Sequence, residues 1–350
     1  MPEQSPDNGS IIIAGFRHPM PGAFFAYDLL MPFLSENPAD ADSLPFSGKQ
    51  IHTFGRRINM SLFEISLWKR ARKGDLIHYL FPEQHYVLGE GLSDKIIKVA
   101  TLHRNLQAYL PENARNLRLK ALASRRLAAL KKFDGIIIHN SEEAEDFRKL
   151  FPKAKVKFIL PGIHSNAAYL KPVTAGHSRH IYTYADKDTD IHTWKDVVQA
   201  AAGIFPDWVF KTGGNRRIAE EMIEGCENAA FAKAEDYESL MTVFGKADIH
   251  FMPALHAGPS SPMLAAHSCG VPTLASDIQG VRDYATATTR TFSTAREALV
   301  LLEQELKFEA HKRNNVKQNT LISAMDFYFE ETARHYFEFY EELFADRTKK

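Results

Sequence analysis

Asp248-Ile249-His250-Phe251-Met252-Pro253 and, further along the chain, Val271-Pro272-Thr273-Leu274-Ala275 are the stretches that decide the fold. Each is a short, mainly apolar run, which is typical of a strand buried on both faces of a parallel sheet. The segment between them has room for a helix, and a strand, a helix and a second strand in that order form a unit with parallel strands. These stretches therefore predict a layered α/β domain.

The same alternation of strand and helix extends outward in both directions. Further strands are expected at 11–15, 75–80, 96–101, 135–139, 181–184, 208–211 and 229–231. Helices are expected at 24–34, 113–132, 194–204 and 236–244, and an aromatic-rich amphipathic helix is expected at 325–347. Alternating elements of this kind predict parallel sheets that are covered by helices on both faces.

A break at Pro161-Gly162, followed by the polar segment 166–180, separates two series of strands. We therefore expect an α/β fold of two doubly wound domains facing across a cleft, where the carboxyl ends of strands from both domains converge. The first domain is predicted to cover 1–162 and to be completed by the helix at 325–347. The second is predicted to cover 163–324.

Length and composition exclude several classes of protein. The 350 residues suffice for two domains, and 45% apolar with 25% charged residues is the composition of a globular chain. Lysine and arginine together number 43, as do aspartate and glutamate, so no net charge draws the chain to nucleic acid. Two cysteines, Cys226 and Cys269, are too few for a disulfide framework and favour a reducing cytoplasm. We find no spanning-length apolar run and no secretory signal.

The residues around the opening stretch are similar to those of a known family. The stretch 248–253 continues through Gly258, Pro262, Leu264 and Ala266 to Cys269-Gly270-Val271-Pro272-Thr273-Leu274-Ala275-Ser276-Asp277 and Gly280. This order resembles the retaining glycosyltransferases of the GT-B fold, family 4, also called glycosyl transferases group 1. Weaker similarities in the family's order lie at 133–142, 159–163 and 331–343. The resemblance implies two Rossmann-like domains and an enzyme of glycan biosynthesis that moves a sugar from a nucleotide diphosphate to an acceptor.

One departure from the family pattern bears on activity. The family carries two glutamates eight positions apart, which hold the sugar hydroxyls and the ribose of the donor. The matching positions here are Ala257 and Ala265. A charge-assisted hydrogen bond of this kind is worth about 1.5–3 kcal/mol. A second hypothesis is therefore an inactive GT-B subunit that binds or scaffolds an active glycosyltransferase, and a third is a fold relative such as an epimerase or a phosphorylase.

The resemblance also implies a set of residues that hold the diphosphate. Lys187 and His192 match the family's basic pair after the first strand of the second domain, and Lys195 is an alternative cation one helical turn further on. Gly22 matches one of two glycines that approach the phosphates in the first domain. The backbone N–H groups from Gly258 through Ser260 and Ser261, with the helix start at Pro262, form an anion cradle that needs no particular side chain.

Other residues are expected to contact the sugar and the acceptor. His103 follows a strand and matches a family histidine that faces the donor sugar, so His103 and Lys187 are the catalytic candidates; the alternatives are a structural histidine and a solvated lysine. Asp277, Ser260 and Ser261 are candidates for sugar hydroxyls. Arg17 and His18 lie in the first strand-to-helix loop and are acceptor-side candidates. In the family's mechanism the departing phosphate itself takes the acceptor proton.

Surface charge and ligand spacing complete the expectations. Basic residues concentrate at 113–132, where some family members touch anionic membrane; a solvated helix face is the alternative. The fifteen histidines are dispersed without metal-ligand spacing, so we expect no metal and no cofactor. The expected partners are a nucleotide sugar and an unidentified glycan, lipid-linked or protein acceptor, with a peripheral position at the inner membrane face as an alternative to a purely cytoplasmic one.

Overall fold

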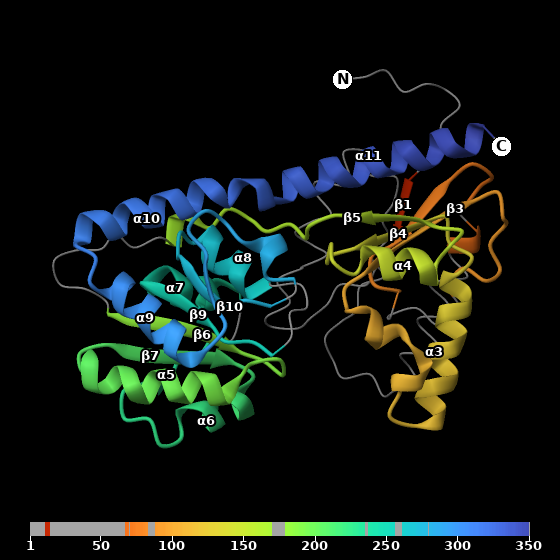
Figure 1. The fold of residues 1–350 in the computed structure, drawn as a ribbon. Helices are drawn as coiled ribbons and strands as arrows, with labels where there is room; N and C mark the ends of the chain where they lie inside the picture. Colours follow the sequence, from red (N-terminus) through yellow and green to blue (C-terminus); the bar gives the residue numbers. More distant parts are fainter. Residues whose placement is uncertain are drawn as a thin grey trace. The chain divides into compact units, whose positions relative to one another are not determined.

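The computed structural model describes residues 11–14, 67–69, 71–82, 88–169, 179–234, 237–255, 261–278 and 280–349. Within this part the chain divides into two compact units (Figure 1). Unit 1 holds the described residues up to Pro161 and from Phe329 on, and unit 2 holds those from Gly162 to Tyr328. Each unit is built on a parallel sheet with helices, so the chain has an α/β fold.

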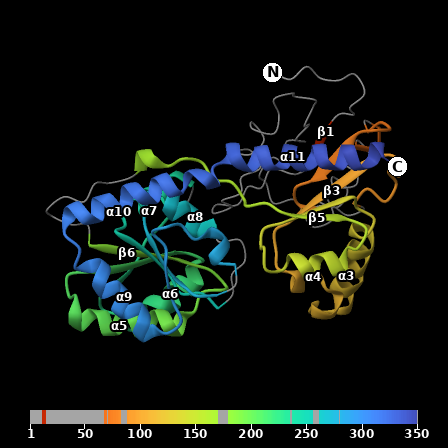
Figure 2. The same ribbon diagram turned by 45° about the horizontal axis from the view of Figure 1, so that its top comes forward.

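The described strands of unit 1 form a five-stranded parallel sheet in which spatial order follows chain order. They are β1 (Ile11–Ala14), β2 (Leu76–Tyr79), β3 (Ile97–Leu102), β4 (Gly135–Ile138) and β5 (Lys155–Phe158). Helices of this unit are α3 (Leu117–Leu130), α4 (Ala144–Leu150) and α11 (Phe329–Thr348), with 3-10 turns at Leu106–Tyr109 and Pro111–Asn113. Figure 2 shows α11 on one face of the sheet and α3 and α4 on the other.

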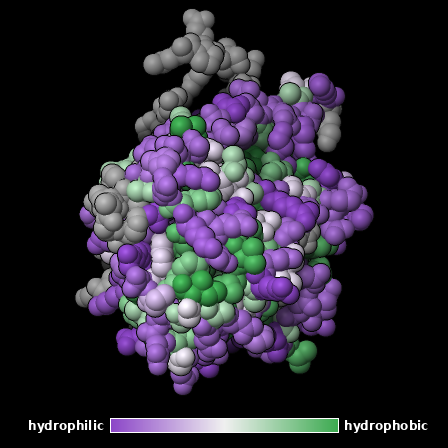
Figure 3. All heavy atoms as spheres, turned by 60° about the vertical axis from the view of Figure 1, so that its left-hand side comes forward, coloured by the Kyte–Doolittle hydropathy of each residue, from purple (hydrophilic) through white to green (hydrophobic). Residues whose placement is uncertain are grey.

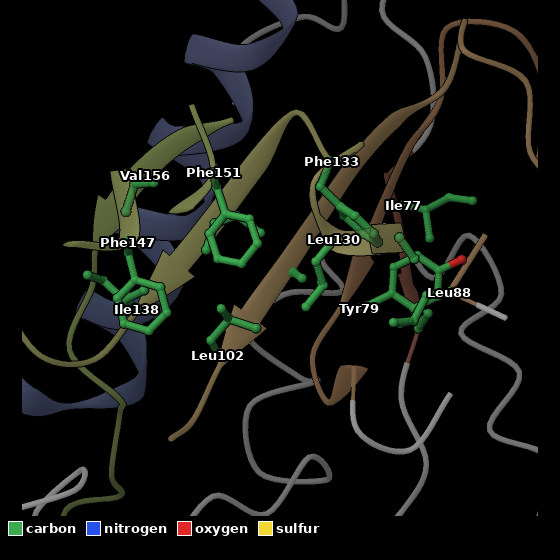
Figure 4. Packing of buried hydrophobic residues seen from close by; sticks show 14 of the residues in the cluster. Ile77, Tyr79, Leu88, Leu102, Leu130, Phe133, Ile138, Phe147, Phe151 and Val156 are labelled. Carbon is green, nitrogen blue, oxygen red and sulfur yellow. The ribbon is translucent and has the colours of Figure 1, made fainter. Parts of the chain in front are cut away.

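Alternate residues of each strand enter different cores, because successive side chains point to opposite faces of a sheet. On β4, Ile136 and Ile138 join a core with Phe147 of α4. Figure 4 shows Ile138 and Phe147 in this core. Ile137, between Ile136 and Ile138, joins a second core, with Phe339 of α11. Burial on both faces explains why the strand sequences are almost continuously apolar.

Helix α11 packs against β4 at Gly135. A Cβ atom at this position would lie 2.8 Å from Leu343 Cδ1 and 3.0 Å from Phe339 Cε1. Such distances are shorter than ordinary van der Waals contact, so any larger residue would push the helix from the sheet. The absence of a side chain at Gly135 is what allows this close approach.

The described strands of unit 2 form a six-stranded parallel sheet of order β11-β10-β9-β6-β7-β8. They are β6 (His180–Ala185), β7 (Val209–Gly214), β8 (Ala229–Phe231), β9 (Ile249–Met252), β10 (Thr273–Ser276) and β11 (Arg290–Phe292). Its helices include α5 (Ile191–Ile204), α6 (Arg216–Ile223), α7 (Tyr237–Lys246), α8 (Ser261–Ser268), α9 (Ala295–Leu306) and α10 (Ala310–Ser323). Short 3-10 turns lie at Ala167–Tyr169, Arg282–Tyr284 and Met325–Phe327.

The order of these strands places a topological switch point between β6 and β9. From β6 the chain builds outward through β7 and β8 and then returns to the other side of β6 with β9, β10 and β11. The register brings Ile181 of β6 opposite both Phe210 of β7 and Ile249 of β9. In open α/β sheets, ligands bind outside the carboxyl ends of the strands at such a point.

The helix predicted at 325–347 is wrong in its first turn. Met325–Phe327 form a separate 3-10 turn, Tyr328 is extended, and α11 begins at Phe329. The reason is a contact distant in sequence: the N–H of Ile163 donates to the Phe327 carbonyl at 2.9 Å, and Ile163 forms a β-bridge with Tyr328.

The predicted helix at 113–132 begins only at Leu117, because the Asn116 side chain caps it by accepting from the Leu119 N–H at 2.9 Å. The helix predicted at 24–34 lies outside the described residues.

Candidate functional site

The loops that follow β6 and β9 meet at the switch point of unit 2. The Asp190 N–H donates to the Pro253 carbonyl at 3.0 Å, and the Leu255 N–H donates to the Asp188 carbonyl at 2.8 Å. A third strand end joins them, since the Ala254 N–H donates to Ser276 Oγ at 2.9 Å. The carboxyl ends of β6, β9 and β10 therefore form one hydrogen-bonded platform.

The loop after β6 is fixed by its own side chains. Asp186 accepts from the Asp188 N–H at 2.9 Å and from the Thr189 hydroxyl at 3.3 Å. Asp190 caps α5 by accepting from the Thr193 N–H at 3.0 Å and from its hydroxyl at 2.7 Å. Burial raises the pKa of Asp186, and the hydrogen bonds from Asp188 and Thr189 oppose that rise. These hydrogen bonds order the backbone of the loop and join it to the start of α5.

Lys187 projects from this loop. Its side chain is 84% exposed, and Nζ lies 2.9 Å and 2.8 Å from the two carboxylate oxygens of Asp188. An exposed ion pair of this kind contributes only about 0–1 kcal/mol. The ammonium can therefore exchange the Asp188 carboxylate for a ligand phosphate at little cost.

The other two residues of the predicted phosphate site lie on α5. His192 is 88% exposed, and its Nδ1 is 3.7 Å from Asp196 Oδ1. Lys195 is half-buried, and its charge acts on the thiol of Cys226, whose pKa is raised by burial. Only Lys187 of the three belongs to the loop at the switch point.

Of the predicted anion cradle, the structure describes only Ser261 and Pro262. The other predicted site residues outside the described part are Arg17, His18, Gly22, Ala257, Gly258 and Ser260. Helix α8 begins at Ser261 with Pro262 next, the position where proline suits a helix start. Ala265 is fully buried in this helix, as are Leu264 and Ala266 beside it. A glutamate at 265 would therefore have to enter the packed interior beside this helix.

Asp277 follows β10 at the surface. Its N–H donates to the Phe292 carbonyl at 2.7 Å, and its Oδ1 lies 3.3 Å from both Nε and Nη2 of Arg282. Asp277 is therefore an ion-paired carboxylate at the same edge of the sheet as Lys187. Asp186 and Ser276, which the sequence reasoning missed, hold the platform together; the rule that polar residues at strand ends carry function would have found both.

Three histidines gather at the carboxyl ends of β2, β3 and β4 in unit 1. His78 lies on β2, with Nδ1 2.5 Å from Tyr340 Oη and Nε2 2.7 Å from Thr101 Oγ1. His103 follows β3, and His139 follows β4, with ring centroids 4.9 Å apart. The predicted His103 is thus one member of a cluster.

The hydrogen bonds of two of these rings fix their tautomers. His103 Nε2 lies 2.6 Å from the Leu80 carbonyl, and His139 Nδ1 lies 2.6 Å from the Ile159 carbonyl. Because a carbonyl only accepts, each of these nitrogens carries the proton. Phe81 stacks on His103 with centroids 4.7 Å apart.

The three rings are neutral at pH 7. Burial lowers the pKa of His78 and of His139 to about 3 and that of His103 to about 4. The charge of His103 lowers the pKa of the other two further, whereas the hydrogen bond to the Leu80 carbonyl opposes the shift of His103. His103 therefore offers a hydrogen bond without adding charge. The sequence reasoning missed His78 and His139; His139 satisfies the same strand-end rule that supported the choice of His103.

Two features are absent from the described part of the chain. No group of three or more His, Cys, Asp or Glu side chains there could hold a metal ion. No helix there has both the length and the apolar character needed to span a bilayer.

No protein-family model and no curated protein matches the sequence. Solved structures do match. A sucrose-phosphate synthase from Thermosynechococcus elongatus is 18% identical, with a TM-score of 0.62 over 82% of this chain and 78% of the other. An E. coli trehalose-6-phosphate structure bound with UDP-2-fluoro glucose is 11% identical, with a TM-score of 0.62 over 91% of this chain and 85% of the other.

A third similar structure is the pneumococcal O-GlcNAc transferase GtfA in complex with UDP and GlcNAc. It is 15% identical, with a TM-score of 0.56 over 82% of this chain and 60% of the other. At these identities the likeness concerns the backbone. The chain therefore has the α/β fold of the GT-B glycosyltransferases that these structures represent.

Proposed function

We propose that the protein is a glycosyltransferase that binds a sugar nucleotide at the carboxyl edge of the unit 2 sheet and transfers the sugar with retention. The observation that carries the proposal is Lys187, an exposed ammonium on a fixed loop at the switch point. Two similar structures support it by their own ligands, UDP-2-fluoro glucose and UDP with GlcNAc. Residues 1–162 with α11 would form the acceptor-side domain and 163–324 the donor-binding domain.

The proposed mechanism assigns electrostatic tasks to the chain. Lys187 neutralises the diphosphate as the sugar leaves, which stabilises the charge that develops in the transition state. Backbone N–H groups from Gly258 to Pro262, with His192 or Lys195, add to this. The departing phosphate oxygen takes the acceptor proton, so no protein base is required. The neutral His103 binds a sugar hydroxyl, and Asp277, Ser260 and Ser261 bind others.

A second candidate function is a GT-B-fold binding or scaffolding subunit without activity. The observation that favours it is the full burial of Ala265 in α8, where the family's pattern has a ribose-binding glutamate. The GtfA/B complex, one of the similar structures, is an assembly. Donor turnover separates the two candidates: an enzyme releases nucleotide from its sugar donor, whereas a scaffold does not.

Replacing Lys187 tests the proposed donor site. We expect Lys187→Ala to weaken binding of the preferred nucleotide sugar about 10- to 100-fold, because a charge-assisted hydrogen bond is worth about 1.5–3 kcal/mol. Calorimetric titration with UDP-, ADP- and GDP-glucose measures it. Lys149→Ala is the matched control, since Lys149 is also an exposed lysine paired with a nearby aspartate, Asp146, at 3.2 Å. Equal affinity of wild type and Lys187→Ala would refute the assignment.

We further propose that α3 of unit 1 touches anionic lipid, which suits a lipid-linked acceptor. We place the protein in the cytoplasm, since both of its cysteines are free thiols. Leu117 is 86% exposed and Leu119 is 45% exposed. The segment 113–132 also carries basic side chains, among them Arg118 and Lys120. Exposed leucines beside positive charge are the features that bind the surface of an anionic membrane.

Vesicle sedimentation tests this contact. Wild type should sediment with vesicles of phosphatidylglycerol and phosphatidylcholine but not with phosphatidylcholine alone, and Leu117→Gln with Leu119→Gln should reduce the bound fraction at least tenfold. Ile322→Gln, which alters an apolar residue of α10 with 64% exposure, should bind like wild type. Equal sedimentation of all three proteins would mean that α3 is only a solvated face.

A further inference from the structure

The two halves of the unit 2 sheet separate at the switch point. The ladder between β6 and β9 ends at its second residue pair, Tyr182 with His250. Beyond this pair β6 stays paired with β7 as far as Ala185, and β9 stays paired with β10 as far as Met252. The strand ends that carry the loops of the platform therefore part from each other between β6 and β9.

A side chain takes over from the backbone at this split. Thr183 follows Tyr182 on β6, and its Oγ1 donates to the Phe251 carbonyl of β9 at 2.7 Å. The same Oγ1 accepts from Trp194 Nε1 of α5 at 3.0 Å. These directions are fixed, because an indole N–H only donates and a carbonyl only accepts. The two hydrogen bonds, which we call the hydroxyl link, thus join α5, β6 and β9.

The hydroxyl link is enclosed by the protein. Thr183 is 2% exposed and Trp194 is fully buried. Figure 3 shows that hydrophobic side chains elsewhere on the chain do gather at the surface, within a surround of hydrophilic ones. The Trp194 ring instead packs edge-on against Phe210 of β7, with centroids 6.3 Å apart. A buried donor or acceptor that loses its partner here has no water to replace it, so breaking the link is costly.

The hydroxyl link anchors both ends of the loop that carries Lys187. One anchor, Thr183, lies near the end of β6, shortly before Lys187. The other, Trp194, lies in the first turn of α5, and its backbone N–H donates to the Asp190 carbonyl at 3.0 Å. The Asp190 N–H in turn donates to the Pro253 carbonyl after β9, also at 3.0 Å. The position of the Lys187 loop relative to β9 is therefore set at these anchors.

We propose that Thr183 and Trp194 are positioning residues, which hold the Lys187 loop at the split in the place where its ammonium meets the donor diphosphate. This inference rests on the proposed function, since the ligand of Lys187 is the donor named there. Neither side chain reaches the donor; both act through the loop. Rigid support places a binding group more precisely than a loop alone, and a misplacement of about 1 Å can cost a factor of about 100 in rate.

Calorimetric titration of the full chain with UDP-, ADP- and GDP-glucose tests the proposal. Thr183→Val keeps the shape of the side chain but removes the hydroxyl, and it should weaken the preferred donor about tenfold. Thr183→Ser restores the hydroxyl and should bind within about twofold of wild type. Trp194→Phe removes the indole N–H and should weaken the donor in the same direction, so it carries the test if Thr183→Val does not fold.

Thr320→Val is the matched control. Thr320 of α10 is also fully buried, donates to the Val316 carbonyl at 2.8 Å and lies 2.7 Å from Thr288 Oγ1. Thr288 precedes β11, so this hydroxyl lies toward the amino-terminal edge of the sheet, opposite to Lys187. The variant should lose stability as Thr183→Val does, but bind the donor like wild type.

Hydrogen exchange without donor gives a second measurement. In Thr183→Val the peptides that cover 186–190 and 253–255 should exchange about tenfold faster than in Thr320→Val, because the strand ends that carry them are no longer joined by the link. Thr183→Ser should exchange like wild type in these peptides.

Equal exchange of these peptides in the two valine variants would overturn the proposal. So would a folded Thr183→Val or Trp194→Phe variant that binds the donor like wild type, or a Thr320→Val variant that loses as much donor affinity as Thr183→Val. Failure of wild type to bind any nucleotide sugar would refute the proposed function and the positioning role with it. Faster exchange in Thr183→Val, which needs no donor, would distinguish that case from failure of the link itself.

Discussion

Lowering the pH from 7 to 4.5 is expected to unfold the protein. Four buried histidines and the half-buried His103 are neutral in the fold because desolvation lowers their pKa values, to about 4 for His103 and about 3 for His78, His139, His250 and His267. In the unfolded chain each titrates near its ordinary pKa of 6.5. Below pH 6.5 the unfolded state therefore binds more protons than the folded state, and stability falls as the pH falls.

The size of this effect is large. Each such histidine costs about 2–3 kcal/mol at pH 4.5, since one pH unit corresponds to about 1.4 kcal/mol. Several of them together reach the whole stability of about 5–15 kcal/mol that is usual for a folded protein. Urea unfolding followed by circular dichroism at pH 7, 6, 5 and 4.5 should show a steadily falling midpoint.

The exposed histidines provide the control for the acid experiment. His192→Gln and His311→Gln alter side chains that are 88% and 74% exposed, and they should leave the pH profile unchanged. Replacing His250, which is fully buried, should lower the midpoint at pH 7 but flatten its fall toward acid. A wild-type midpoint that is constant between pH 7 and 4.5 would contradict this account of the histidines.

Lys317→Met is expected to lower the free energy of unfolding by about 3 kcal/mol. Lys317 of α10 is buried, with Nζ 2.8 Å from the Ala247 carbonyl and 3.7 Å from Asp248 Oδ1. Removing one partner of a buried ion pair costs about 3–5 kcal/mol, because the other charge is left without compensation. The lower end applies here since Arg313 still faces Asp248. Urea titration at pH 7 measures the loss.

Two further variants separate charge from packing. Lys307→Met removes an exposed lysine whose Nζ lies 2.5 Å from Glu303 Oε1. This variant should change the free energy of unfolding by less than about 1 kcal/mol. Adding Asp248→Asn to Lys317→Met should recover part of the loss, because the buried carboxylate that lost the Lys317 ammonium is then replaced by a neutral amide. Equal costs for Lys317→Met and Lys307→Met would show that the buried pair has no special role.

The sequence predicted the central strands of both units because burial on both faces leaves a continuous apolar run, as in Ile136-Ile137-Ile138. It missed α10 for a physical reason. The residues that α10 buries are Arg313, Lys317 and Thr320, so the helix has the right spacing but no apolar periodicity. The edge strands β5 and β11 were missed because they are short and partly polar.

The candidate site was predictable in part. The resemblance to the GT-B family selected Lys187 and His103, and the position of His103 after a strand supported that choice. Asp277 was selected as a residue of the loop after the last expected strand. The environment of His78 was not predictable, because its partner Tyr340 lies on α11 at the other end of the chain. Likewise the platform depends on the bond from Ala254 to Ser276, which only the order of strands in the sheet brings about. His103, Lys187 and the other proposed contacts remain predictions until a ligand is bound.

Hydrogen exchange of the full chain with and without its preferred nucleotide sugar tests the central claim most directly. If the donor binds at the switch point, peptides that cover 186–190 and 253–262 will exchange more slowly when it is present, and those at the amino-terminal edge, such as 204–208, will not change. Protection confined to the amino-terminal edge, or unchanged exchange at both loops with saturating donor, would contradict the assignment.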